Sequence, residues 1–208
     1  MVLACNTATA RALDLVRARS TVPVIGVVRP GAVAAASATR SANVAVIATA
    51  GTVESGAYPD AIIEAAPGTR VVQRACPDLV PLVEAGILGG RRAESVLRAY
   101  LEPLLREAPG LDTLLLGCTH YPLLRPVIEA IVGQGVAVVD SAFTTALAVE
   151  DLLDALGARV ETGGRVNHRV ATTGDVEAFV SVASRLFGDR LPDVEAVRIE
   201  PAGAIPLD

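Results

Sequence analysis

The chain has 208 residues, enough for one domain or two small ones with a buried core. Hydrophobic residues make up 51% of the sequence and aromatic residues only 3%, so the core has to be built from Ala, Val, Leu and Ile. The formal net charge of −5 argues against a general affinity for nucleic acids or acidic membrane surfaces.

The sequence also lacks the usual signals for membranes and secretion. Charged residues or prolines interrupt every apolar run well before the roughly 18 residues that a membrane span needs. No charged region followed by an apolar stretch and a cleavage site is visible at the N-terminus. Three cysteines are too few for a disulfide framework, which fits a reducing compartment. We therefore expect a cytoplasmic protein.

Apolar runs and segments of helical periodicity alternate along the chain. We expect strands at residues 2–4, 22–28, 44–48, 70–74, 112–117, 136–139, 166–172 and 194–199. We expect helices at residues 8–19, 32–40, 54–66, 79–85, 91–107, from the segment after Cys118 to 131, at 142–156 and, capped by Asp175, to 187. This alternation predicts an α/β fold with mainly parallel sheets built from βαβ units.

The chain contains no long linker, so short loops must make any crossing between domains. The expected crossings lie near residues 29–31 and 140–142. We therefore predict one α/β domain from residues 1–30 and 141–208 and a second from residues 31–140.

Two cysteines follow apolar strands in the same way. The apolar runs 2–4 and 114–117 end at Cys5 and Cys118, and a threonine follows each cysteine within two positions. Open α/β sheets bind ligands at the carboxyl ends of their strands, and a helix N-terminus there can lower the pKa of a thiol. We predict that both thiols are functional and that they face each other across a cleft, whereas Cys76 is expected to be a small buried hydrophobe.

Two other roles for these residues are less well supported. Cys5, Cys118 and His120 could be three metal ligands, but Cys-x-His is not a usual zinc spacing and no second close pair exists, so we expect no metal. Cys118 and His120 could form the nucleophile pair of a thiol hydrolase, but Cys5 would then have no role. His168 falls within an expected strand, where a structural histidine with satisfied hydrogen bonds is the usual case.

Residues 49–52 form a hydroxyl-rich loop between a strand and a helix. Thr52 could simply cap the helix. Alternatively, Thr49 and Thr52, with the exposed amides of the loop, could bind a carboxylate at the helix N-terminus. The glycines of residues 86–90 lack a following Lys-Ser/Thr and join two helices, so a nucleotide site there is poorly supported.

Five motifs, taken together and in this order, resemble those of glutamate racemases. They are Ala-Cys-Asn-Thr-Ala at residues 4–8, Pro-Val-Ile-Gly-Val at 23–27 with the Pro-Gly of 30–31, the Thr-x-x-Thr-x-x-Ser-x-x-Tyr pattern at 49–58, Cys-Pro-x-Leu-Val-Pro-Leu-Val-Glu at 76–84, and Leu-Gly-Cys-Thr-His-Tyr-Pro-Leu-Leu at 116–124. The motifs cover most of residues 1–150.

This resemblance implies a fold and a mechanism. The fold would be two pseudo-symmetric α/β domains with the active site in the cleft between them. The activity would be interconversion of L- and D-glutamate without a cofactor, with one cysteine as thiolate base and the other as thiol acid. Cys118 would take the α-proton from L-glutamate and Cys5 from D-glutamate. A thiol with a reference pKa near 8.5 can serve in either form near neutral pH.

The resemblance also implies a set of site residues and a biological role. The substrate's carboxylates and ammonium group would be held by Asn6, Thr7, Thr49, Thr52 and Thr119. His120 would assist Cys118, and Glu84 would help from a more distant position. The product, D-glutamate, is a building block of bacterial peptidoglycan, which points to cell-wall biogenesis and cell shape. The expected partner is therefore a small molecule, and a homodimer is one assembly that the resemblance allows.

The sequence departs from the family pattern at its start. Family members carry further strands upstream of the first cysteine, with an Asp-Ser motif and a Pro-Tyr-Gly loop, whereas here only four residues precede Cys5. We therefore expect an incomplete first domain, and little racemase activity and a tendency to aggregate for the 208-residue chain alone. Two alternative functions follow: a racemase or isomerase of the same superfamily acting on aspartate or another acid, or an inactive, truncated acid-binding protein.

Overall fold

The computed structural model describes residues 1–160, 167–188 and 193–199. The chain forms two compact units, one made of Met1–Val83 with Ile87–Arg159 and the other of Glu84–Gly86 with Val160–Asp208. Within the described residues every strand pairs in parallel, which confirms the predicted α/β class with mainly parallel sheets. The domain division predicted from the sequence stays a prediction.

The first unit is built around a four-stranded parallel sheet. Its order is β4 (Arg70–Ala75), β3 (Asn43–Ala48), β5 (Thr113–Gly117) and β6 (Ala137–Asp140). The central strands β3 and β5 are buried along almost their whole length, as expected for unbroken apolar runs in the middle of a parallel sheet. Ala48 pairs with Gly117, so these two strands end side by side.

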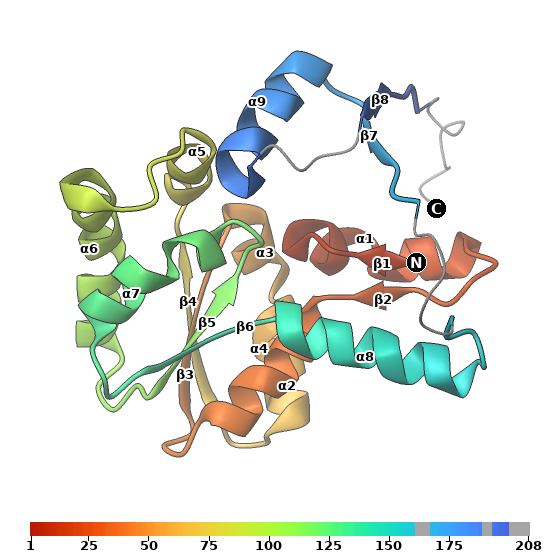
Figure 1. Ribbon diagram of the computed structural model, residues 1–208. Coiled ribbons are helices and arrows are strands. Elements are labelled where there is room, and N and C mark those ends of the chain that lie inside the picture. The colour runs from red at the N-terminus through yellow and green to blue at the C-terminus, as the bar shows by residue number, and fades with distance from the viewer. Residues whose placement is uncertain (161–166, 189–192, 200–208) are drawn as a thin grey trace, which may run out of the picture. The chain divides into compact units, whose positions relative to one another are not determined.

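Helices cover both faces of this sheet (Figure 1). The helices α2 (Val28–Ala38) and α4 (Ala57–Ala65) pack together on one face, and α6 (Gly90–Glu107) and α7 (Arg125–Val132) pack together on the other. The α2 and α4 side contains a core cluster of fully buried small and branched side chains with one aromatic ring, that of Tyr58.

A second, two-stranded parallel sheet lies in the same unit. It pairs β1 (Val2–Leu3) with β2 (Ile25–Gly26). The helix α1 (Asn6–Arg19) packs against both strands, and α8 (Ala142–Ala155) packs against β2 (Figure 1). Because β1 and β5 belong to different sheets, the strands that lead to the two cysteines come from different parts of the unit.

The strand expected at residues 22–28 is reduced to Ile25–Gly26, and its C-terminal end is cut short because α2 begins at Val28 and not at Ala32. The sequence motif Arg-Pro-Gly at 29–31 suggested a break. Proline is nevertheless accepted in the first turn of a helix, where its missing N–H would have no partner in any case. Pro30 therefore lies inside the first turn of α2.

The single helix expected at residues 54–66 is two helices, α3 (Ala50–Ser55) and α4. They are separated by Gly56, whose φ of 69° is left-handed and favours glycine. The residue that caps α3 is Thr49, whose side chain accepts a hydrogen bond from the Thr52 N–H, so the alternative in which Thr52 is the cap does not hold.

The remaining elements agree with the expected order. They are α5 (Leu79–Glu84), the 3₁₀ turn η1 (Tyr121–Leu124) and, in the second unit, β7 (Val170–Thr172), α9 (Val176–Phe187) and β8 (Val194–Ala196). Asp175 caps α9 as predicted. His168 is exposed and precedes β7, so its expected place in a strand was wrong; Val166, where that strand was expected to begin, lies outside the described residues. None of the helices in the described ranges is long and apolar enough to cross a membrane.

Candidate active site

Cys118 directly follows β5, as the sequence predicted, and its side chain is only 7% exposed. Its Sγ lies 3.9 Å from Nδ1 of His120, which is half-buried, while the intervening Thr119 is exposed. Burial raises the pKa of the Cys118 thiol above its ordinary value, and the backbone N–H of His120 opposes this only in part. The expected lowering of this pKa was therefore wrong, because the chain enters a 3₁₀ turn and desolvation outweighs the local dipoles.

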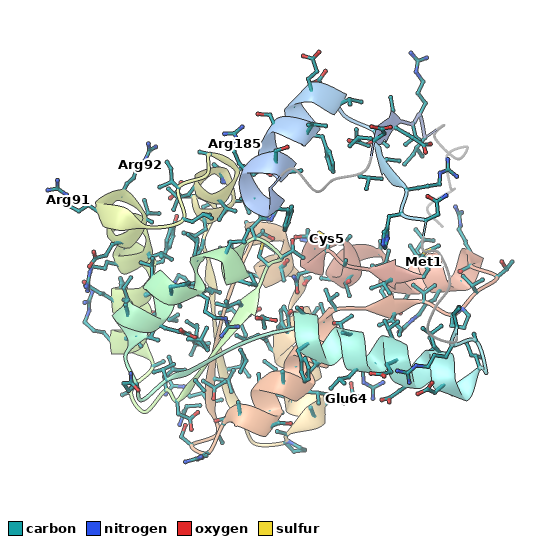
Figure 2. The ribbon with its side chains drawn as sticks, in the orientation of Figure 1. Met1, Cys5, Glu64, Arg91, Arg92 and Arg185 are labelled. Atoms are coloured by element: carbon teal, nitrogen blue, oxygen red, sulfur yellow. The ribbon has the colours of Figure 1, made fainter. Side chains whose placement is uncertain are left out.

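Cys5 stands at the N-cap position of α1, two residues after the end of β1, and it is exposed; Figure 2 labels its position. A negative charge on Cys5 raises the pKa of Cys118 further, so the two thiols are close enough to interact electrostatically. Two like charges in one site disfavour each other, so the two thiols are not expected to be ionised at the same time.

Three predicted hydroxyl groups meet between α1 and α3. The Oγ1 atom of Thr7 lies 2.8 Å from that of Thr49 and 3.0 Å from that of Thr52, and the last two lie 3.1 Å apart. Arg11 holds the same two helices together through the carbonyl of Gly51. The structure thus places Thr7, which follows the first cysteine, in contact with the hydroxyl-rich loop after β3.

Asn6 is 2% exposed and lies between Cys5 and this hydroxyl cluster in the sequence. Its Oδ1 accepts a hydrogen bond from the hydroxyl of Tyr58. Its Nδ2 is buried and has no hydrogen-bond partner among the described residues. A buried amide without an acceptor is costly, which makes Nδ2 a donor suited to a bound carboxylate.

A cavity of about 570 Å³ lies beside Cys118. Its walls are mostly apolar, and its polar lining comes from Cys118, Thr119, Asp140, Ser141 and Thr145. Thr145 Oγ1 is buried without a partner in the described part of the chain. The cavity is large enough to bring a small molecule next to the Cys118 side chain, against mostly apolar walls.

The remaining predicted site residue, Glu84, is exposed at the end of α5 and belongs to the second compact unit. Its predicted supporting role therefore stays a prediction.

Sequence reasoning assigned no function to Tyr58 or Ser141, although Tyr58 closed one of the five motifs. The pKa of Tyr58 is strongly raised, mainly by burial, while a hydrogen bond from the Ser141 side chain opposes this rise. A polar residue every third position from Thr49 to Tyr58 was the available signal. It could not reveal that the last of them contacts Asn6.

The described residues contain no group of three or more His, Cys, Asp or Glu side chains arranged to hold a metal ion. Among these residues, Cys5, Cys118 and His120 therefore do not form a set of three metal ligands.

The α/β fold, with a cysteine after a strand of each of two sheets, matches a known class of protein, the amino-acid racemases. A family model described as Asp/Glu/Hydantoin racemase matches residues 1–150. A glutamate racemase from Geobacter metallireducens is 44% identical over 200 residues, which cover 96% of this chain and 73% of that protein. Another from Beutenbergia cavernae is 45% identical over 218 residues, covering 99% of this chain and 73% of that protein. The chain belongs to the glutamate racemase family.

Solved structures agree with this assignment. A crystal structure of a glutamate racemase isoform from Bacillus anthracis matches with a TM-score of 0.88 at 36% identity, covering 95% of this chain and 73% of that one. The glutamate racemase from Francisella tularensis, solved in complex with D-glutamate, matches with a TM-score of 0.85 at 28% identity, covering 95% of this chain and 72% of that one.

Proposed function

We propose that this protein interconverts L- and D-glutamate without a cofactor, using Cys5 and Cys118 as a pair of bases. The observation that carries the proposal is the placement of the two thiols. They follow strands of different sheets, yet they interact electrostatically in one unit. Repulsion between like charges disfavours two thiolates at once, and racemisation requires one thiolate and one thiol.

The proposed reaction from L-glutamate begins with the Cys118 thiolate, which takes the α-proton. The electron pair of the broken C–H bond delocalises into the α-carboxylate, and the Cys5 thiol then gives its proton to the opposite face. The products are D-glutamate, a Cys118 thiol and a Cys5 thiolate. From D-glutamate the two cysteines exchange roles.

The α-proton is very weakly acidic, so the developing carbanion needs preorganised donors. We assign this task to Asn6, Thr7, Thr49, Thr52 and Thr119, which together would hold the carboxylates and the ammonium group. His120 would assist proton transfer at Cys118, and Glu84 would support it from a greater distance. The buried donor of Asn6 and the cluster of three hydroxyls support this assignment.

The decisive experiment supplies L-glutamate in deuterated water to the purified protein in its full natural length. We expect circular dichroism to decay to zero as D-glutamate forms, with deuterium appearing at the α-carbon of the product. Binding of glutamate without α-proton exchange would instead identify a non-catalytic acid-binding protein. Racemisation of a different acid would move the protein elsewhere in the superfamily.

We predict a preference for glutamate over aspartate by a factor of at least about 100 in kcat/KM. A site arranged to pair two carboxylates at the glutamate spacing leaves buried donors unpaired when the shorter acid binds. The measurement compares kcat/KM for the two acids. Equal values, or a preference for aspartate, would contradict the substrate assignment.

The proposed biological role follows from the product. D-Glutamate would supply peptidoglycan synthesis in the cytoplasm and so support cell-wall biogenesis and cell shape. A homodimer is the assembly state to test first, by light scattering after size-exclusion chromatography.

A further inference from the structure

The hydroxyl of Tyr58 lies at a junction of several elements in the first unit. Tyr58 belongs to α4, is fully buried, and donates a hydrogen bond to Oδ1 of Asn6 at the start of α1. A Cβ atom added at Gly31 of α2 would lie 3.1 Å from this hydroxyl and 3.1 Å from the Cβ of Ser141, the N-cap residue of α8. The hydroxyl therefore sits in a confined space between α1, α2 and α8.

The hydrogen bonds at this junction have a defined direction. The Tyr58 hydroxyl donates to Oδ1 of Asn6, and Ser141 approaches the same hydroxyl from the start of α8. The single hydroxyl proton of Tyr58 is then directed to Asn6. The acceptor at Asn6 has to be the carbonyl oxygen, because an amide nitrogen cannot accept.

This direction decides which end of the Asn6 amide is free. With Oδ1 bound to Tyr58, the group left without a partner among the described residues is Nδ2, a donor. If the amide were reversed, a carbonyl oxygen would take its place and would repel a carboxylate. We propose that Tyr58 is a positioning residue that fixes the Asn6 amide so that Nδ2 faces the anionic substrate as a hydrogen-bond donor.

This inference rests on the proposed function for the identity of the substrate. It goes further because it names the residue that fixes the orientation of the Asn6 side-chain amide, namely Tyr58 on a different helix. Its immediate consequence is that Tyr58 and Asn6 act as one unit in substrate binding.

The test is a double-mutant cycle with Tyr58→Phe and Asn6→Ala in the full-length protein. Tyr58→Phe keeps the buried ring and removes only the hydroxyl. We expect it to raise KM for glutamate about tenfold with a smaller change in kcat, as for loss of one hydrogen bond to a charged group. In the Asn6→Ala background the same substitution should change KM less than about twofold.

The matched control is Tyr121→Phe. Tyr121 is also fully buried, and its hydroxyl donates to the carbonyl of Cys76 over 2.8 Å. Both tyrosine substitutions should lower Tm by similar amounts, but only Tyr58→Phe should raise KM. An unchanged KM in Tyr58→Phe, or a full additional tenfold effect in the Asn6→Ala background, would overturn the positioning role.

A second measurement does not depend on turnover. The side-chain amide of Asn6, observed by ¹⁵N NMR in the absence of ligand, should shift or broaden in Tyr58→Phe and stay unchanged in Tyr121→Phe. If wild-type protein did not racemise glutamate, the proposed function would fail, yet this signal would still decide the Tyr58 assignment. An unaltered Asn6 signal in Tyr58→Phe would refute it.

Discussion

Among the individual residues, the three cysteines occupy three different environments. Cys5 is exposed, Cys118 is nearly buried beside a cavity, and Cys76 is fully buried. Burial raises the pKa of Cys118 and brings that of Cys76 to about 12. Since the thiolate is the nucleophile, these differences should appear directly in chemical reactivity.

Alkylation with iodoacetamide at pH 7.5 should therefore modify Cys5 fastest, Cys118 slowly and Cys76 hardly at all. The raised pKa means that the thiolate fraction of Cys118 is small at this pH, so its rate should increase as the pH rises towards and through that pKa. Mass spectrometry of the peptides measures all three rates in one sample. Equal rates at Cys5 and Cys118, with no acceleration at high pH, would contradict this account.

Replacement of Cys5 or Cys118 by alanine should reduce kcat at least about a thousandfold while leaving the fold intact, because each thiol is assigned one of the two proton transfers. Cys76→Ala is the control and should retain most of the activity, with a modest loss of stability from the small cavity it leaves. Near-normal racemisation by Cys118→Ala would rule out the two-base mechanism.

Among the secondary-structure elements, the ends of β3 and β5 place the site residues, and Gly117 makes this possible. A Cβ atom at Gly117 would lie 2.9 Å from Cε2 of Tyr58, 3.1 Å from the Cβ of Ala48 and 3.2 Å from the carbonyl oxygen of Ile47. Any other residue at this position would crowd the Tyr58 ring and the end of β3. The position of Cys118, one residue further on, depends on this close approach.

Gly117→Ala should therefore destabilise the protein by about 1–3 kcal/mol, as overpacking of a core usually does, and lower kcat by displacing Cys118. Gly135→Ala is the matched control, since a Cβ there meets nothing within 4 Å and the backbone has no left-handed φ. Denaturant unfolding and racemase kinetics of both variants provide the measurement. Wild-type stability in Gly117→Ala would show that the strand ends are not tightly packed.

For the whole molecule, one carboxylate links the loop after α2 to the start of β5. Asp112 accepts hydrogen bonds from the Thr39 hydroxyl at 2.6 Å and from the backbone N–H groups of Arg40 and Ser41 at 2.7 Å each. Burial opposes ionisation of Asp112, but these hydrogen bonds outweigh it and lower its pKa to about 2. The ionised form is therefore part of the folded state.

Because the folded pKa is lower than the unfolded one, Asp112 stabilises the fold above about pH 4, and this contribution is lost as the pH falls towards 2. Asp112→Asn should lower Tm at pH 7, and its difference from wild type should shrink between pH 4 and pH 2. Calorimetry across this range measures the difference. A constant gap in Tm would mean that the charge of Asp112 has no part in stability.

The sequence by itself determined the features that depend on neighbouring residues. Unbroken apolar runs such as 114–117 predicted buried parallel strands, and the polar residues that follow them predicted where ligands bind. The motifs around Cys5 and Cys118 by themselves indicated the family. Local patterns failed where they had two outcomes, as at Pro30, which can end a strand or enter the first turn of a helix.

Only the tertiary structure decided the features that depend on distant residues. The hydrogen bond between Tyr58 and Asn6 joins residues 52 positions apart, so no local pattern could predict it. The direction of the Cys118 pKa shift was also misjudged from the sequence, because burial is imposed by packing from other segments and outweighs the dipoles of the adjacent turn. Desolvation and the direction of a hydrogen bond depend on how distant segments pack together. They determine the chemical behaviour of residues such as Cys118 and Asn6, whereas the sequence indicated only that these residues belong to the site.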